Sequence, residues 1–320
     1  FVWQGRVDDE EPQHLASRVH QLVSTLDGAD PSHRDGLAIV GFCSDEGVRR
    51  NKGRVGAKKS PDLLRQALAN IPWSIDRRVY DAGNIVCEGS ELEQAHQELA
   101  GSVSRLLDMG HFVFVLGGGH EVAYGSWLGL FNHLQSQHSS VTKDPVKIGP
   151  VNIGIVNFDA HFDLRKDTNG VSSGTPFYQI ANHCEANNSA FKYCCLGVSE
   201  MANTQALFER ADELGVSYRR DSQMEMRHFD ATVAQLEAFI EDCDVLYLTI
   251  DLDVFPASVA PGVSAPAAKG VSLDVIEPLI EIIKRSGKLK LADIAEYNPN
   301  YDIDQWTARL AARLFHSIVV

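Results

Sequence analysis

Short apolar runs alternate along the chain with longer amphipathic stretches. Strands that are buried on both faces of a parallel sheet read as continuous apolar runs of this kind, so the runs predict strands. They are Leu37–Cys43, Phe112–Leu116, Asn152–Phe158, Tyr193–Val198, Val245–Ile250 and Leu289–Ile294.

The stretches between these runs predict helices. The clearest one extends from Ser90, which Glu93 follows at the spacing of a capping box, to Gly110. Further helices are expected near residues 61–69, 202–214, 230–241, 273–285 and 303–317. Alternating strands and helices predict an α/β fold with three layers, in which helices cover both faces of a central parallel sheet. No boundary is visible in the sequence, so we expect residues 1–320 to form a single domain.

Composition narrows the class of function. The chain has 320 residues and a formal net charge of −14, which argues against nucleic-acid binding. No stretch approaches the roughly 20 apolar residues of a membrane span, and the first residues do not form a signal peptide. The six cysteines form no CxxC pair, so we expect free thiols rather than disulfides or a zinc site. These features predict a cytoplasmic protein.

Ionisable residues follow directly after four of the predicted strands. They are His120, then Asp159, His161 and Asp163, then Asp251 and Asp253, and finally Glu296. Ligands of open α/β sheets bind outside the carboxyl ends of the strands, so these two histidines and five carboxylates should meet at one edge. If the backbone is extended, residues two apart in each motif also share one face.

Each of these residues taken alone has an ordinary explanation. A histidine after glycines is more often a loop residue than a ligand, and an Asp-x-Asp pair is more often a solvated turn. Together, however, five anionic groups at one edge would repel one another, and the neighbouring segments supply too few Lys or Arg to compensate. Two divalent cations would resolve this repulsion. Carboxylate and imidazole ligands without a thiolate favour Mn²⁺ over structural Zn²⁺, and this set can hold a two-metal site.

The segments around these residues resemble the metal signatures of the ureohydrolase family, which includes arginase, agmatinase and formimidoylglutamase. They are Gly117-Gly118-Gly119-His120-Glu121, Asp159-Ala160-His161-Phe162-Asp163 and Thr249-Ile250-Asp251-Leu252-Asp253, in the order of the family. The resemblance extends from Gly36 to the C-terminus, which leaves residues 1–35 as an N-terminal extension. It implies an arginase-like fold, two Mn²⁺ ions per subunit and assembly into a homo-oligomer, either a trimer or a hexamer.

The resemblance also implies a role for each ligand. His120 and Asp163 would bind one ion, and His161 and Asp253 would bind the other. Asp159 and Asp251 would bridge both ions. A water shared by the ions would be activated for attack on an amidine or guanidine carbon. Glu296 matches the acidic residue that faces this group in the substrate, and Asp163 could relay a proton to the leaving nitrogen.

One departure indicates the branch of the family. Arginases and agmatinases carry Gly-Asn-x-His-Gly after the second metal motif, with a histidine that assists proton transfer. Here Ser173 stands in the place of that histidine, and Gly174 follows it. The form Ser-Ser-Gly-Thr-Pro-Phe at residues 172–177 resembles formimidoylglutamase instead.

A basic segment supports an anionic substrate. Residues 49–59 contain six Lys or Arg and no acid. The segment is either a solvated loop or a site for substrate carboxylates. Arg54 is the first candidate for a carboxylate contact, with Asn51 beside it and Arg165 from the loop after Asp163.

These observations favour hydrolysis of N-formimidoyl-L-glutamate to L-glutamate and formamide, a step of histidine degradation. This substrate is a small anionic amidine with two carboxylates, and no nucleic-acid or membrane partner is expected. The alternatives are another hydrolase of amidino or guanidino compounds, such as a guanidinobutyrase, an agmatinase or an arginase-like enzyme. A non-enzymatic metal-binding protein is a further alternative.

Overall fold

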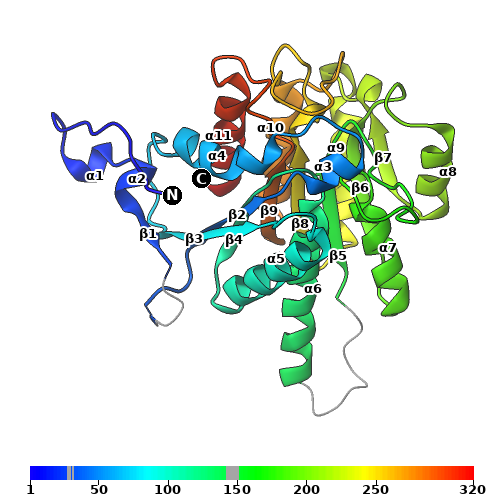
Figure 1. The fold of residues 1–320 in the computed structure, drawn as a ribbon, viewed down its shortest axis with the longest axis horizontal. Helices are drawn as coiled ribbons and strands as arrows, with labels where there is room; N and C mark the ends of the chain where they lie inside the picture. The colour runs from blue at the N-terminus through cyan, green and yellow to red at the C-terminus, as the bar shows by residue number, and fades with distance from the viewer. Residues whose placement is uncertain (27–29, 31, 142–150) are drawn as a thin grey trace.

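The computed structural model describes residues 1–26, 30, 32–141 and 151–320. Its centre is a nine-stranded sheet in the order β1-β3-β2-β4-β9-β8-β5-β6-β7, and every pairing between these strands is parallel (Figure 1). The strands are β1 Val23–Thr25, β2 Leu37–Cys43, β3 Val79–Val86, β4 Phe112–Leu116, β5 Ile153–Phe158, β6 Lys192–Val198, β7 Ser217–Arg220, β8 Val245–Asp251 and β9 Leu289–Ala295.

Helices cover both faces of this sheet. Near the N-terminus lie α1 Gln13–Ala16, α2 Val19–Leu22 and α3 Glu46–Arg50. One hydrophobic core packs α4 Ser60–Leu68, α9 Phe229–Glu241, α10 Leu273–Arg285 and α11 Trp306–Val319 against the sheet. The opposite core packs α5 Leu92–Asp108, α6 Val122–Val141, α7 Pro176–Ala186 and α8 Gln205–Glu213 (Figure 1). The predicted three-layer α/β fold with a central parallel sheet is therefore confirmed.

Burial on both faces explains why the strands are apolar throughout. In β2, Leu37 and Ile39 belong to one core, whereas Ala38 and Val40 belong to the other. Side chains of a strand alternate between faces, so a strand with a core on each side needs an apolar residue at every position. The six predicted strands each lie within one residue of the observed bounds.

Other elements differ from the sequence-based expectation. The strands β1, β3 and β7 and the helices α1, α2, α3, α6 and α7 were not predicted. Helix α5 begins at Leu92, its N-cap is Glu91, and no side chain caps it, so the capping box predicted at Ser90 and Glu93 is wrong. The backbone turns immediately before the helix, where Glu91 N donates to Glu88 O and Leu92 N to Ser90 O.

The topology brings the predicted functional residues to one edge. The four strands that precede them, β4, β9, β8 and β5, are consecutive neighbours at the centre of the sheet. Because these strands are parallel, their carboxyl ends open on the same side. Within the described residues, no helix is long and apolar enough to cross a bilayer.

Candidate metal centre and substrate cavity

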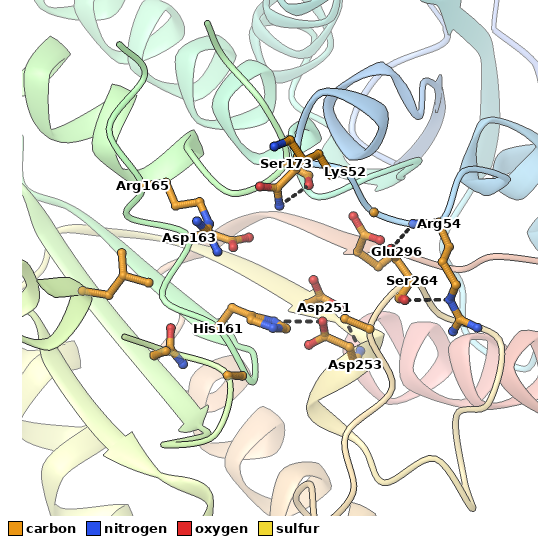
Figure 2. Close-up of a pocket in the computed structure, with 16 residues that line it drawn as sticks. Lys52, Arg54, His161, Asp163, Arg165, Ser173, Asp251, Asp253, Ser264 and Glu296 are labelled. Atoms are coloured by element: carbon orange, nitrogen blue, oxygen red, sulfur yellow. Dashed lines mark hydrogen bonds and ion pairs between the residues drawn. The ribbon is translucent and has the colours of Figure 1, made fainter. Parts of the chain in front are cut away.

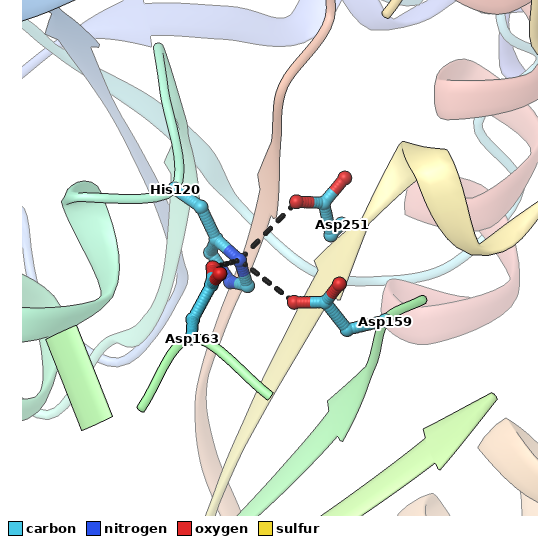
Figure 3. A group of neighbouring side chains, drawn as sticks. All are labelled: His120, Asp159, Asp163 and Asp251. Atoms are coloured by element: carbon cyan, nitrogen blue, oxygen red, sulfur yellow. Dashed lines mark ion pairs between the residues drawn. The ribbon is translucent and has the colours of Figure 1, made fainter. Parts of the chain in front are cut away.

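His120 forms the centre of a buried group of carboxylates. It lies between β4 and α6 and is 1% exposed. Its Nε2 is 3.0 Å from the Thr249 hydroxyl, which fixes the ring orientation. Its Nδ1 faces carboxylate oxygens of Asp159, Asp163 and Asp251 at 3.0, 2.9 and 3.2 Å (Figure 3).

This group fits a divalent cation. Within the described part of the chain, the Nδ1 atom of His120 is buried without a hydrogen-bond partner, although three carboxylates surround it. We assign the ring proton to Nε2 because that atom contacts the Thr249 hydroxyl, so Nδ1 presents a lone pair to the acidic oxygens. Lone pairs that converge on one point without a proton between them are the donor set of a metal ion.

A second group adjoins the first. His161 Nδ1 is 3.0 Å from Asp253 Oδ2 and 3.5 Å from Asp159 Oδ1. Asp159 belongs to both groups, and within each group the possible ligand atoms lie within 4.8 Å of one another. It turns Oδ2 to His120 and Oδ1 to His161, as a bridging ligand would. Asp251 belongs to the first group only, so bridging by Asp251 stays a prediction.

Turns, and not an extended backbone, gather these ligands. Asp163 has a left-handed φ of 48°, and His161 N donates to Asp159 Oδ1 at 2.6 Å. After β8, residues Leu252–Val254 form a turn of 3₁₀-helix, in which Asp253 N donates to Asp251 Oδ1 at 2.8 Å. The expectation that alternate residues share a face of an extended segment is therefore wrong, because the chain bends immediately beyond both strands.

Close approach of the backbone explains the glycines before His120. A Cβ atom on Gly118 would lie 1.9 Å from Ser44 O, so no other residue fits. On the other side of the site, Asn203 Nδ2 donates to Ala160 O and its Oδ1 accepts from Phe162 N. Asn203 therefore holds the loop that carries His161.

Burial and mutual repulsion control the charges of the cluster. Burial and then the Asp159 charge raise the pKa of Asp163 to about 6. Burial and then the Asp253 charge raise the pKa of Asp251. Burial raises the pKa of Asp159, but the neighbouring imidazoles of His120 and then His161 outweigh it and lower that pKa. A divalent cation would offset the repulsion and favour ionised ligands throughout.

Glu296 lies directly beyond β9 and turns into the site. Its φ of 66° is left-handed, its Oε1 accepts from His120 N at 2.8 Å, and its Oε2 is buried without a partner. Burial and then the nearby Glu121 charge raise its pKa to about 8. An unpartnered buried carboxylate oxygen is suited to a cationic N–H donor.

The two groups and Glu296 open into a cavity of about 340 Å³ (Figure 2). His161, Asp163, Asp251 and Asp253 line it together with Glu296. The predicted substrate residues Asn51, Arg54, Arg165 and Ser173 also line it. This volume suits a small molecule.

The predicted substrate residues differ in their freedom to bind a ligand. Asn51 Nδ2 donates to Ser173 Oγ at 3.2 Å. A Cβ atom on Gly174 would lie 2.9 Å from Arg165 Cδ, so this glycine lets Arg165 approach closely. Arg165 itself is exposed and has no ion-pair or hydrogen-bond partner for its guanidinium among the described residues. By contrast, Arg54 donates to the carbonyl of Ser264 (Figure 2) and to that of Val263. Its guanidinium also stacks on the ring of Tyr301 at 3.8 Å.

The basic segment at residues 49–59 begins inside a helix. Arg49 and Arg50 belong to α3, and both donate to Glu46. Arg50 also pairs with Glu93 at 2.7 Å. These two arginines are therefore neutralised by acids that lie outside the segment.

A model of the Arginase family matches residues 35–320. Among curated proteins, the formimidoylglutamase of Aeromonas salmonicida is 54% identical over 99% of this chain and 96% of its own length. The formimidoylglutamase of Vibrio parahaemolyticus is 52% identical over 98% of this chain and 92% of its own length.

Two solved structures are also similar in fold to this chain. The Trypanosoma cruzi formiminoglutamase crystallised with Mn²⁺ is similar with a TM-score of 0.77 and 26% identity, covering 91% of this chain and 94% of that chain. The formimidoylglutamase of Bacillus subtilis has the same fold, with a TM-score of 0.77 and 22% identity, over 94% of this chain and 91% of that chain.

Proposed function

The chain belongs to the arginase family, and we propose that it is a formimidoylglutamase, which hydrolyses N-formimidoyl-L-glutamate to L-glutamate and formamide. The observation that carries this proposal is the cavity that joins two metal-binding groups to Glu296 and to Arg165, whose guanidinium has no partner among the described residues. One end of such a cavity suits a cationic amidine, and the other suits an anion. Identities of 52–54% to formimidoylglutamases over nearly the whole chain favour the same substrate.

The metal ligands we propose follow from the two groups. His120, Asp163 and Asp251 would hold one Mn²⁺, while His161 and Asp253 would hold the other. Asp159 would bridge both ions through its two oxygens, and we propose that Asp251 bridges them as well. When bound, two Mn²⁺ ions lower the pKa of a water between them and supply a nucleophile near neutral pH.

The residues of the chain position the substrate around this centre. Glu296 accepts hydrogen bonds from the cationic amidine, because its Oε2 is buried and free of other donors. Asp163 lines the same cavity, and we propose that it passes a proton to the nitrogen that leaves as the amino group of glutamate. The water oxygen forms a bond to the formimidoyl carbon, and that water is the source of the proton that Asp163 carries. The C–N bond to the leaving nitrogen breaks, and the carbon departs as formamide.

At the other end of the substrate, carboxylates require donors. Arg165 offers a planar guanidinium that no described residue engages, and Asn51 and Ser173 offer neutral donors beside it. Gly174 allows the close packing of Arg165 and Asn51. The guanidinium of Arg54 is already engaged by two carbonyls, so Arg54 contributes less directly than the sequence predicts.

Substrate comparison tests this proposal. The Mn²⁺-loaded protein is assayed with formimidoylglutamate, guanidinobutyrate, agmatine and arginine, and the products are identified. We expect formamide and glutamate from the first compound at the highest kcat/KM. Faster turnover of a guanidino compound would assign the chain to another branch, and no turnover of any of them would support a non-enzymatic role.

Two further properties belong to the same proposal. All six cysteines are free and buried, which is typical of a reducing compartment, so we propose that the enzyme acts in the cytoplasm. We also propose that it forms a homo-oligomer, because the family resemblance implies a trimer or hexamer. Sedimentation equilibrium of the purified protein tests this assembly, and a monomer at micromolar concentration would contradict it.

A further inference from the structure

Lys52 occupies a backbone conformation that normally belongs to glycine. Helix α3 ends with Asn51 as its C-cap, and Lys52 follows with a left-handed φ of 63°. Lys52 N donates to Arg49 O at 3.0 Å and Gly53 N to Val48 O at 2.8 Å, which are the two hydrogen bonds of a Schellman motif. Glycine takes the left-handed position of this motif without strain, whereas a side chain makes it less favourable.

Four other cations of the basic segment are engaged elsewhere. Arg49 and Arg50 bind Glu46, and Arg54 donates to two backbone carbonyls. Lys58 Nζ donates to Cys87 O at 2.8 Å. Their positive groups therefore already have partners within the chain.

Lys52 is placed differently. It is exposed, and its ammonium has no hydrogen-bond or ion-pair partner in the part of the chain that the structure describes. It lines the cavity of the metal groups and also a neighbouring cavity of about 480 Å³. Arg165 lines the same two cavities, and its guanidinium has no partner among the described residues. Figure 2 shows both side chains at the first cavity. Two cations, Lys52 and Arg165, thus lie where the cavity of the metal groups meets the neighbouring cavity, in a protein of net charge −14.

We propose that Lys52 is a specificity-determining residue that binds one carboxylate of a dicarboxylate substrate, while Arg165 binds the other. This inference rests on the proposed function. The strained backbone supports this proposal. If the position had only a structural role, glycine would be the more stable residue in its left-handed conformation. Local strain of this kind persists where the side chain is needed. The ammonium adapts to a carboxylate from several directions, whereas the guanidinium offers a planar pair of donors.

The decisive variant is Lys52→Gly, because it removes the charge and relieves the backbone at once. If Lys52 only completes the helix end, this variant keeps full activity. If Lys52 binds substrate, kcat/KM for formimidoylglutamate falls roughly 5- to 50-fold, the range between an exposed ion pair and a charge-assisted hydrogen bond. In both cases the melting temperature should be equal to or higher than that of the parent protein.

Matched variants and substrates isolate the charge. Lys59→Ala removes a lysine of the same segment that does not line either cavity, so its kcat/KM should equal that of the parent. Lys52→Arg should restore most of the activity. Formamidine carries no carboxylate, and its turnover should be unchanged in Lys52→Gly, as should the Mn²⁺ content.

Calorimetric binding of L-glutamate to the Mn²⁺-loaded protein separates this inference from the proposed function. We expect weaker binding by Lys52→Gly than by the parent or by Lys59→Ala. Equal L-glutamate affinity in all three proteins, including an equal lack of binding, would overturn the inference. If the parent turns over no formimidoylglutamate, but its L-glutamate binding depends on Lys52, the proposed function fails while the inference stands.

Discussion

Glu296→Gln tests how the cavity recognises the cationic end of its substrate. The side chain is 5% exposed, and its Oε1 accepts from His120 N, a contact that a glutamine oxygen can keep. The other oxygen, Oε2, has no partner within the described chain and would become an NH₂ group. A donor would then face the N–H donors of the amidine.

The size of the effect follows from this burial. A buried hydrogen bond to a charged group contributes about 1.5–3 kcal/mol. Its loss lowers kcat/KM by roughly 10- to 150-fold at about 1.4 kcal/mol per factor of ten. The melting temperature should not fall, because burial and the Glu121 charge already raise the pKa of Glu296 to about 8 and removal of its charge relieves that repulsion.

The assay is steady-state hydrolysis of formimidoylglutamate, with Mn²⁺ content measured on the same samples. Glu121→Gln is the matched control. Glu121 is an equally buried carboxylate that accepts from Ser44 Oγ and Gly47 N, and it does not line the cavity. Its amide should preserve both contacts and most of the activity. A Glu296→Gln enzyme as active as the Glu121→Gln enzyme would show that Glu296 does not bind the amidine.

Four further variants probe other parts of the structure. Arg165→Ala should lower kcat/KM for formimidoylglutamate with no change in melting temperature. Arg54→Ala should lower the melting temperature, because it loses two carbonyl contacts and a stacked ring. The opposite pattern would show that Arg54 binds the substrate and that Arg165 stabilises the fold. Thr249→Val removes the contact that orients His120 and should weaken Mn²⁺ binding roughly 10- to 100-fold, measured by competition with a chelator, while an unchanged affinity would contradict that role. Burial lowers the pKa of His96 to about 4 from an unfolded value of 6.5, so its stabilising contribution is present above pH 6.5 and is lost as the pH falls toward 4, by roughly 3 kcal/mol. His96→Phe should therefore lose less stability than the parent between pH 7 and 4 in denaturant titrations, and an equal loss would contradict this.

The central strands could be predicted because burial on both sides leaves a continuous apolar signature. Strand β3 lacks that signature, since Asp81, Gly83 and Asn84 interrupt it. The buried Asp81 is explained by donors that the strand pattern does not show, Arg65 from α4 and the indole of Trp3. Helix α6 was missed for the opposite reason. It packs against α5 and α7 and is apolar around much of its surface, so it shows no helical period.

The candidate ligands could be predicted because each directly follows a strand. In a parallel sheet the carboxyl ends of neighbouring strands lie at one edge, so the residues that follow them meet there. Thr249 could also have been found, because it lies two residues before Asp251 on the same strand and shares its face. The substrate side could not be predicted in the same way. The direction of the Arg54 side chain depends on carbonyls about 210 residues away in the sequence. The left-handed conformation of Lys52 could not be predicted either, because a lysine in the sequence does not indicate that conformation as a glycine would.

Titration of the metal-free protein with Mn²⁺ tests the proposed two-metal centre most directly. Bound metal and hydrolysis of formimidoylglutamate are measured on the same samples as Mn²⁺ is added. Because Asp159 joins the two groups, we expect activity to reach its plateau at two ions per chain and Asp159→Asn to lose both ions. Full activity with one ion per chain or none would contradict the two-metal centre.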